Sequence, residues 1–204
     1  MNRITRSLIL SVVCLAMAVP AMANVKTGGP APDFTLSDTG GKSHSLSGFK
    51  GKFVVLEWLN HDCPFVQKHY GSGNMQSLQK EFTGNGVIWL SINSSSEGQQ
   101  GQYSPQEADE LTRQTGAAPT AVLLDSDGKV GRRYGARTTP HMFIINPDGV
   151  LIYQGAIDDK ASTDPEDIPD SKNYVKAALS EAMSGQPVTT PTTKSYGCSV
   201  KYKF

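Results

Sequence analysis

Cys63 stands where a cysteine can become a nucleophile, after an apolar run at residues 51–60 and directly before Pro64. Proline is favoured in the first turn of a helix, so Cys63 is predicted to lie at a helix N-terminus. That position lowers the pKa of a thiol, and it is the thiolate that attacks a disulfide or a peroxide. The alternatives are half of a structural disulfide, a metal ligand and a buried, unreactive side chain.

Several side chains close to this cysteine are candidates to support the thiolate or to contact a substrate. His61, Lys68 and His69 are the nearest potential cations, and cations favour the charged form of a thiol. Pro64 and Phe65 follow the cysteine directly and are candidate substrate-binding residues. Ordinary surface or capping roles for the two histidines, and core packing for Phe65, are the competing interpretations.

Residues 1–23 have the pattern of a secretory signal peptide. A short basic start precedes an apolar run that is too short to span a bilayer, and a small-x-small pattern ends at Ala23. We therefore expect cleavage after Ala23 and a periplasmic or secreted protein without a membrane anchor. The remaining chain, about 181 residues, suits one domain. Its 17 basic and 19 acidic residues give no basic surface for nucleic acid.

Cleavage would remove Cys14 and leave two cysteines, Cys63 and Cys198, in a compartment where disulfides form. The tail at residues 186–204 carries Cys198, and its extended reach of about 40 Å lets that residue approach any part of such a domain. A structural disulfide, a resolving cysteine and a free tail thiol are all open. The cysteines and histidines have no close ligand spacing, so we expect neither a metal nor another cofactor.

The candidate residues lie within an alternation of predicted strands and helices. A hairpin is predicted at 34–46, helices from Pro64 to 82 with an interruption at Gly71 and Gly73, at 104–116 and at 171–185, strands at 51–60, 86–95 and 120–128, and a second hairpin at 141–155. Alternating strands and helices imply parallel crossovers, and the late hairpin adds antiparallel strands. The predicted fold is α/β, with a central mixed sheet and helices on both faces.

A second motif, A-R-T-T-P-H-M-F-I-I, places Pro140 directly before an apolar strand. A cis-proline in a tight turn and an ordinary trans proline are both open there. Together with the motif around Cys63, it resembles the thioredoxin superfamily over roughly residues 29–185. The opening G-G-P-A-P-D-F-T-L resembles the redoxin branch, which includes alkyl hydroperoxide reductase and thiol-specific antioxidant. The chain is most similar to exported peroxiredoxin-like proteins with a C-P-F-V site and a G-C-S-V-K-Y tail.

This resemblance implies a thioredoxin-like (redoxin) domain over residues 24–185, in which Cys63 faces a cis-Pro140 loop. The backbone of Thr139 and the ring of Pro140 would hold an extended substrate strand. Arg137 is a candidate to support the thiolate from the same loop. Protein or small-molecule thiols and disulfides, together with hydroperoxides, are the implied reaction partners.

Departures from the family patterns shape the expected chemistry. Val66 occupies the position of the second cysteine in C-x-x-C. Leu56 and Asn60 stand where the peroxidatic signature P-x-x-x-[ST]-x-x-C has proline and serine or threonine. We therefore predict an exported thiol-dependent oxidoreductase in which Cys63 attacks and Cys198 or an external thiol resolves the product. A strict hydroperoxide reductase, and a non-catalytic module that binds a peptide or a metal, are the alternatives.

Overall fold

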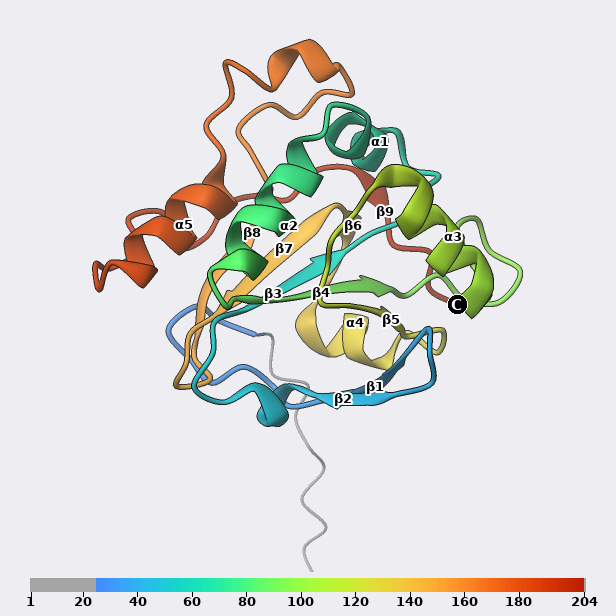
Figure 1. Cartoon of the computed structure of the whole chain (residues 1–204), viewed down its shortest axis with the longest axis horizontal. Coiled ribbons are helices and arrows are strands. Elements are labelled where there is room, and N and C mark those ends of the chain that lie inside the picture. Colours follow the sequence, from blue (N-terminus) through green and yellow to red (C-terminus); the bar gives the residue numbers. More distant parts are fainter. Residues whose placement is uncertain (1–24, 204) are drawn as a thin grey trace, which may run out of the picture.

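The computed structural model describes residues 25–203 (Figure 1). The predicted signal peptide and its cleavage site lie outside the described residues. Between residues 25 and 203, none of the helices is long and apolar enough to cross a membrane. The chain folds around one seven-stranded sheet, and its C-terminal tail returns to form a second, two-stranded sheet.

The large sheet has the strand order β2-β1-β5-β4-β3-β7-β8. β3, β4 and β5 are parallel at its centre, and the outer pairs are antiparallel. The strands are β1 (Thr35–Asp38), β2 (Ser43–Ser45), β3 (Val54–Trp58), β4 (Ile88–Asn93), β5 (Ala121–Leu124), β7 (His141–Ile145) and β8 (Leu151–Gly155). This is the predicted mixed sheet, and the α/β fold class is confirmed.

Helices cover both faces of the sheet (Figure 1). They are α1 (Pro64–Gly71), α2 (Asn74–Gly84), α3 (Pro105–Thr115), α4 (Lys129–Tyr134) and α5 (Tyr174–Met183), with short 3-10 turns at Leu46–Phe49 and Pro165–Asp167. Local sequence sets the ends of α3 in particular. Ser104 and Glu107 form a reciprocal capping box at its start, and Gly116, with a φ of 65°, ends it.

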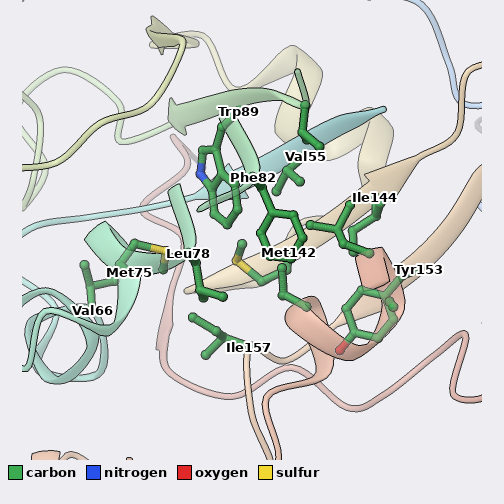
Figure 2. Close-up of a cluster of buried hydrophobic side chains, with 14 of the residues drawn as sticks. Val55, Val66, Met75, Leu78, Phe82, Trp89, Met142, Ile144, Tyr153 and Ile157 are labelled. Carbon is green, nitrogen blue, oxygen red and sulfur yellow. The ribbon is translucent and has the colours of Figure 1, made fainter. Parts of the chain in front are cut away.

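The two faces of β3 enter separate hydrophobic clusters, because successive side chains of a strand point in opposite directions. Val55 packs with side chains of α1, α2 and α5 and with Trp89 of β4 (Figure 2). Val54, Leu56 and Trp58 pack on the other face, under α4. Every residue of β3 is buried, as the continuous apolar run predicts, so the strand gives the following Cys63 a rigid base.

The predicted strands, hairpins and helices all occur, and three short elements were missed. α4 follows Gly128, in a stretch for which the sequence predicted no helix. β6 (Thr138–Thr139) and β9 (Cys198–Ser199) form the small sheet. Strands of two residues have no hydrophobic period to recognise, which explains why the sequence did not reveal them.

The tail follows an ordered path across the domain. Gln154 of β8 bridges to Thr192, and the Thr193 hydroxyl accepts a hydrogen bond from the backbone of Ala156. Beyond β9, the Val200 amide donates to the Arg137 carbonyl. These contacts carry the chain from the far edge of the sheet to the loop before β7, and they place Cys198 next to α1.

Candidate active site

Cys63 is the N-cap residue of α1, and Pro64 takes the first helical position, as predicted. Its carbonyl accepts the amides of Val66 and Gln67, which begin the helix. The thiol therefore sits at the positive end of the helix dipole, beyond the carboxyl end of β3. Open α/β sheets keep their sites at this edge. The side chain is 1% exposed.

The loop that contains Pro140 closes over Cys63. The Thr139–Pro140 peptide bond is cis, which is one of the two arrangements that the sequence left open. The Cys63 Sγ donates to the Thr139 carbonyl oxygen at 3.0 Å. The Thr139 hydroxyl is buried and has no hydrogen-bond partner among the described residues. A cysteine at a helix start and the cis-proline loop thus meet as the family resemblance implied.

The tail brings Cys198 to the same place. β9 runs antiparallel to β6, with Cys198 opposite Thr139 and Ser199 opposite Thr138. Gly197 makes this approach feasible, because its φ is 124° and a Cβ there would lie 2.1 Å from the Thr139 carbonyl oxygen. Both cysteines are free thiols in this structure.

The two thiols have pKa values that move in opposite directions. Burial raises the pKa of Cys63, but the neighbouring Cys198 and Thr139 favour the thiolate and outweigh it, so the net pKa lies below the ordinary value. Burial and the neighbouring Cys63 raise the pKa of Cys198 to about 11. Cys63 is therefore the better thiolate and Cys198 its protonated partner, as an attacking and a resolving thiol require.

Lys68 and His69 do not have the supporting role that the sequence predicted. Both are buried, and their polar contacts are with Asp158, Tyr196, the Lys160 carbonyl and Asn74 rather than with the Cys63 thiol. Burial lowers the pKa of His69 to about 4, so it is neutral at neutral pH. Helix geometry explains the error, because residues five and six positions after the N-cap face away from it.

The other predicted neighbours separate into close and remote residues. Phe65 packs against Tyr196, with 5.8 Å between the two ring centroids, so it contacts the tail. The pKa of His61 is lowered to about 4 by burial, and its ring lies between Tyr70 and Tyr103. It therefore supplies no positive charge at neutral pH. Arg137 is exposed and lines a groove of about 510 Å³ together with Thr138 and Lys194.

Sequence reasoning missed a buried carboxylate on β3. Glu57 accepts hydrogen bonds from Tyr70, Gln79, Trp89 and Ser91 within the first hydrophobic cluster. Burial raises its pKa, against the effect of those donors. A single acidic residue inside an otherwise apolar strand was the available signal, since buried charges are rare unless partnered.

Two further residues near the site could not be singled out from the sequence. Tyr196 lies two positions before Cys198, and Asp158 follows β8 in the loop toward α5. They meet only because the tail crosses α1. Within residues 25–203 the structure has no group of three or more histidine, cysteine or acidic side chains arranged to hold a metal ion.

Comparison with known proteins agrees with this geometry. A family model described as AhpC/TSA family matches residues 27–154, well over half of the chain. The chain belongs to the AhpC/TSA family. The redoxin resemblance seen in the sequence is thereby confirmed, and the match covers the Cys63 motif and the Pro140 loop but not the tail with Cys198.

Individual relatives add detail. The thiol-disulfide oxidoreductase ResA of Bacillus subtilis (strain 168) is 30% identical over 129 residues, which are 63% of this chain and 66% of that protein. The crystal structure of an uncharacterized conserved protein from Geobacillus kaustophilus is 27% identical, with a TM-score of 0.75 over 87% of this chain and 93% of that one. A hypothetical protein from Sinorhizobium meliloti 1021 shares the fold at 23% identity, with a TM-score of 0.74 over 89% and 97% of the two chains.

Proposed function

We propose that this AhpC/TSA-family protein is a thiol-disulfide oxidoreductase in which Cys63 is the nucleophile and Cys198 the resolving cysteine. The observation that carries the proposal is the contact of two free thiols with opposite pKa shifts at a helix N-terminus and beside a cis-proline loop. The named relative supports the reaction class.

The reaction runs in two exchanges. The Cys63 thiolate attacks one sulfur of a substrate disulfide, which forms a mixed disulfide and releases the other sulfur as a thiolate. The Cys198 thiol gives its proton to that released thiolate. Cys198 then attacks Cys63, so that a 63–198 disulfide forms and the second substrate sulfur leaves as a thiolate. An external dithiol returns the protein to the reduced form.

The surrounding residues serve these steps. The hydroxyl of Thr139 and the thiol of Cys198 stabilise the attacking thiolate. Val66 is buried beneath Cys63, so the resolving thiol comes from the tail rather than from a C-x-x-C motif. The backbone of Thr139 and Pro140 is the proposed docking site for the substrate strand. The basic, apolar and small-x-small pattern of residues 1–23 supports periplasmic or secreted action.

Differential alkylation with intact-mass detection, across a series of glutathione buffers, tests the proposal. The mature protein is expected to pass from dithiol to 63–198 disulfide over a narrow range of potential. Cys63→Ser should abolish reduction of a disulfide substrate, whereas Cys198→Ser should stop at a mixed disulfide on Cys63. Turnover that survives Cys63→Ser would refute the assignment. Consumption of hydroperoxide with no exchange of disulfides would favour the peroxidase alternative instead.

A further inference from the structure

Tyr196 ties the tail to the helix that Cys63 begins. Its ring centroid lies 5.8 Å from that of Phe65, and the Lys68 Nζ lies 5.9 Å from the centre of the Tyr196 ring. Tyr196 is two residues before Cys198, so contacts that fix the Tyr196 ring also restrict the position of the Cys198 thiol. One helix thus carries the attacking cysteine at its start and the contacts of the tail along its next two turns.

A directed chain of hydrogen bonds passes through the Tyr196 hydroxyl. The Asn74 side-chain amide donates to His69 Nδ1 at 2.9 Å, so the neutral ring carries its hydrogen on Nε2. His69 Nε2 then donates to the Tyr196 hydroxyl at 3.0 Å. The hydroxyl in turn donates to Asp158 Oδ1. His69 and Tyr196 each accept one hydrogen bond and donate one, which fixes the orientation of the phenol.

The chain ends on a buried ion pair. Lys68 Nζ lies 3.5 Å from Asp158 Oδ2, and both side chains are fully buried. Lys68 also donates to the Lys160 carbonyl at 2.8 Å, and Asp158 Oδ1 accepts the Lys160 amide at 3.1 Å. Burying two charges is costly, so such a pair is poor evidence of a device for stability alone. Here the pair orients the group that fixes Tyr196.

General attachment of the tail does not need this cluster. Beyond Cys198, the Val200 amide bonds to Arg137, and the Tyr202 hydroxyl donates to the Ala136 carbonyl at 2.8 Å. Before it, Thr193 bonds to β8. The Tyr196 cluster fixes the tail segment between those two attachments. This segment carries Cys198 and covers Cys63.

We propose that Lys68, His69, Asp158 and Tyr196 form a tail clamp, a set of positioning residues that presents Cys198 to Cys63 and keeps the tail over the Cys63 thiol. This inference rests on the proposed function, because it concerns the 63–198 exchange. Because the clamp is already formed in the reduced protein, it raises the effective concentration of the Cys198 thiol at Cys63. The same clamp slows the reaction of Cys63 with outside reagents.

Tyr196→Phe tests the clamp with the smallest change, since it keeps the ring on Phe65 and removes the hydroxyl. We expect the equilibrium constant of the 63–198 disulfide in glutathione buffers to fall about tenfold, which raises the reduction potential by about 30 mV. In the reduced protein, alkylation of Cys63 by a maleimide should become several-fold faster. The two readouts move together only if the tail loosens at Cys198.

Two further variants complete the test. Asp158→Asn keeps an acceptor oxygen but removes its charge, so an intermediate fall of about threefold is expected, because hydrogen bonds to charged groups are stronger. Tyr202→Phe removes a tail hydroxyl that does not contact α1, and it should leave the equilibrium constant within about twofold of the unmodified protein. Thermal unfolding of the reduced proteins checks that each variant is folded. If Tyr196→Phe does not fold, the equilibrium constant of Asp158→Asn decides whether the clamp exists.

Equal shifts in Tyr196→Phe and Tyr202→Phe would overturn the clamp, because the cluster would then only attach the tail. An unchanged equilibrium constant in a folded Tyr196→Phe would also overturn it, with the proposed exchange left intact. A protein in which no buffer forms the 63–198 disulfide would refute the proposed function first, and the clamp with it.

Discussion

Cys198 faces Thr139 across a two-residue antiparallel ladder, directly before the cis-Pro140 bond and beside the Cys63 thiol. The tail thus pairs with the backbone that the family resemblance assigns to a substrate strand. In the reduced protein this edge is occupied by the chain itself. A substrate that reaches Cys63 must displace β9 or arrive while the tail is loosened.

Replacement of the partner thiol should weaken the Cys63 thiolate. Cys198→Ala removes the neighbouring side chain that most lowers the pKa of Cys63, so this pKa should rise. Thiolate ultraviolet absorbance measured against pH would show the shift. Ser199→Ala, on the exposed neighbour in β9, is the matched control and should leave the titration unchanged. An unaltered curve in Cys198→Ala would mean that the thiols do not interact.

Thr139→Val should separate reactivity from stability. The variant removes a buried hydroxyl that lowers the pKa of Cys63 but has no hydrogen-bond partner among the described residues. We expect a higher Cys63 pKa and slower attack at neutral pH, with no loss of folding free energy, since no satisfied hydrogen bond is broken. Alkylation rates against pH and chemical unfolding provide the two measurements. Thr138→Val, whose hydroxyl bonds to the Pro140 carbonyl, is the control for the loop.

Gly197→Ala should displace the tail from the site. The new methyl group would meet the Thr139 carbonyl oxygen at 2.1 Å, in a backbone conformation that disfavours any side chain. We expect a loss of stability of more than about 1 kcal/mol and a weaker tendency to form the 63–198 disulfide. Gly185→Ala has the same kind of positive φ with open space around it. That control should lose stability but form the disulfide normally.

The buried histidines should make the fold sensitive to mild acid. Burial lowers the pKa of His69 to about 4 and that of His141 to about 3, against 6.5 for an ordinary histidine. Between these values the unfolded chain binds protons that the folded chain does not, so stability falls as the pH drops from 6.5 toward 4. The slope is at most about 1.4 kcal/mol per pH unit for each histidine.

His141→Asn isolates this effect, because an amide oxygen can replace Nδ1 as the acceptor of the Arg137 amide. Chemical unfolding at a series of pH values should give a shallower acid loss in the variant. Glu57 acts in the opposite direction, since its raised pKa makes the folded protein bind the extra proton. It is present in both proteins, so the difference between them reports His141 alone. Parallel pH profiles would contradict the assignment.

Local signals in the sequence were sufficient for the fold and for one half of the site. Three of these signals each extend over only a few residues: the apolar run of β3, the proline after Cys63 and the helix-start residues of α3. The elements that they predict are all present. The expected thiol-dependent oxidoreductase came from the family resemblance that the Cys63 and Pro140 motifs carry, and the AhpC/TSA match confirms the family. Pairing of β6 with β9 could not be predicted, because two strands of two residues far apart in the chain carry no pattern of their own.

The error over Lys68 and His69 has a similar origin. Their closeness to Cys63 in the sequence suggested cations beside a thiol, but as the fifth and sixth residues of α1 they face away from the N-cap. Their partners, Asp158 and Tyr196, come from a loop and a tail whose positions only the tertiary structure sets.

The meeting of Cys63 with Cys198 closes residues 63–198, about three quarters of the described chain, into a single loop. Contacts between residues so distant in the sequence carry a larger loop-closure cost than local ones. The site is therefore completed by residues 196–199, which lie outside the stretch that matches the family model. Without them the thioredoxin-like core holds one uncovered thiol, so the paired site exists only when β9 has docked on β6.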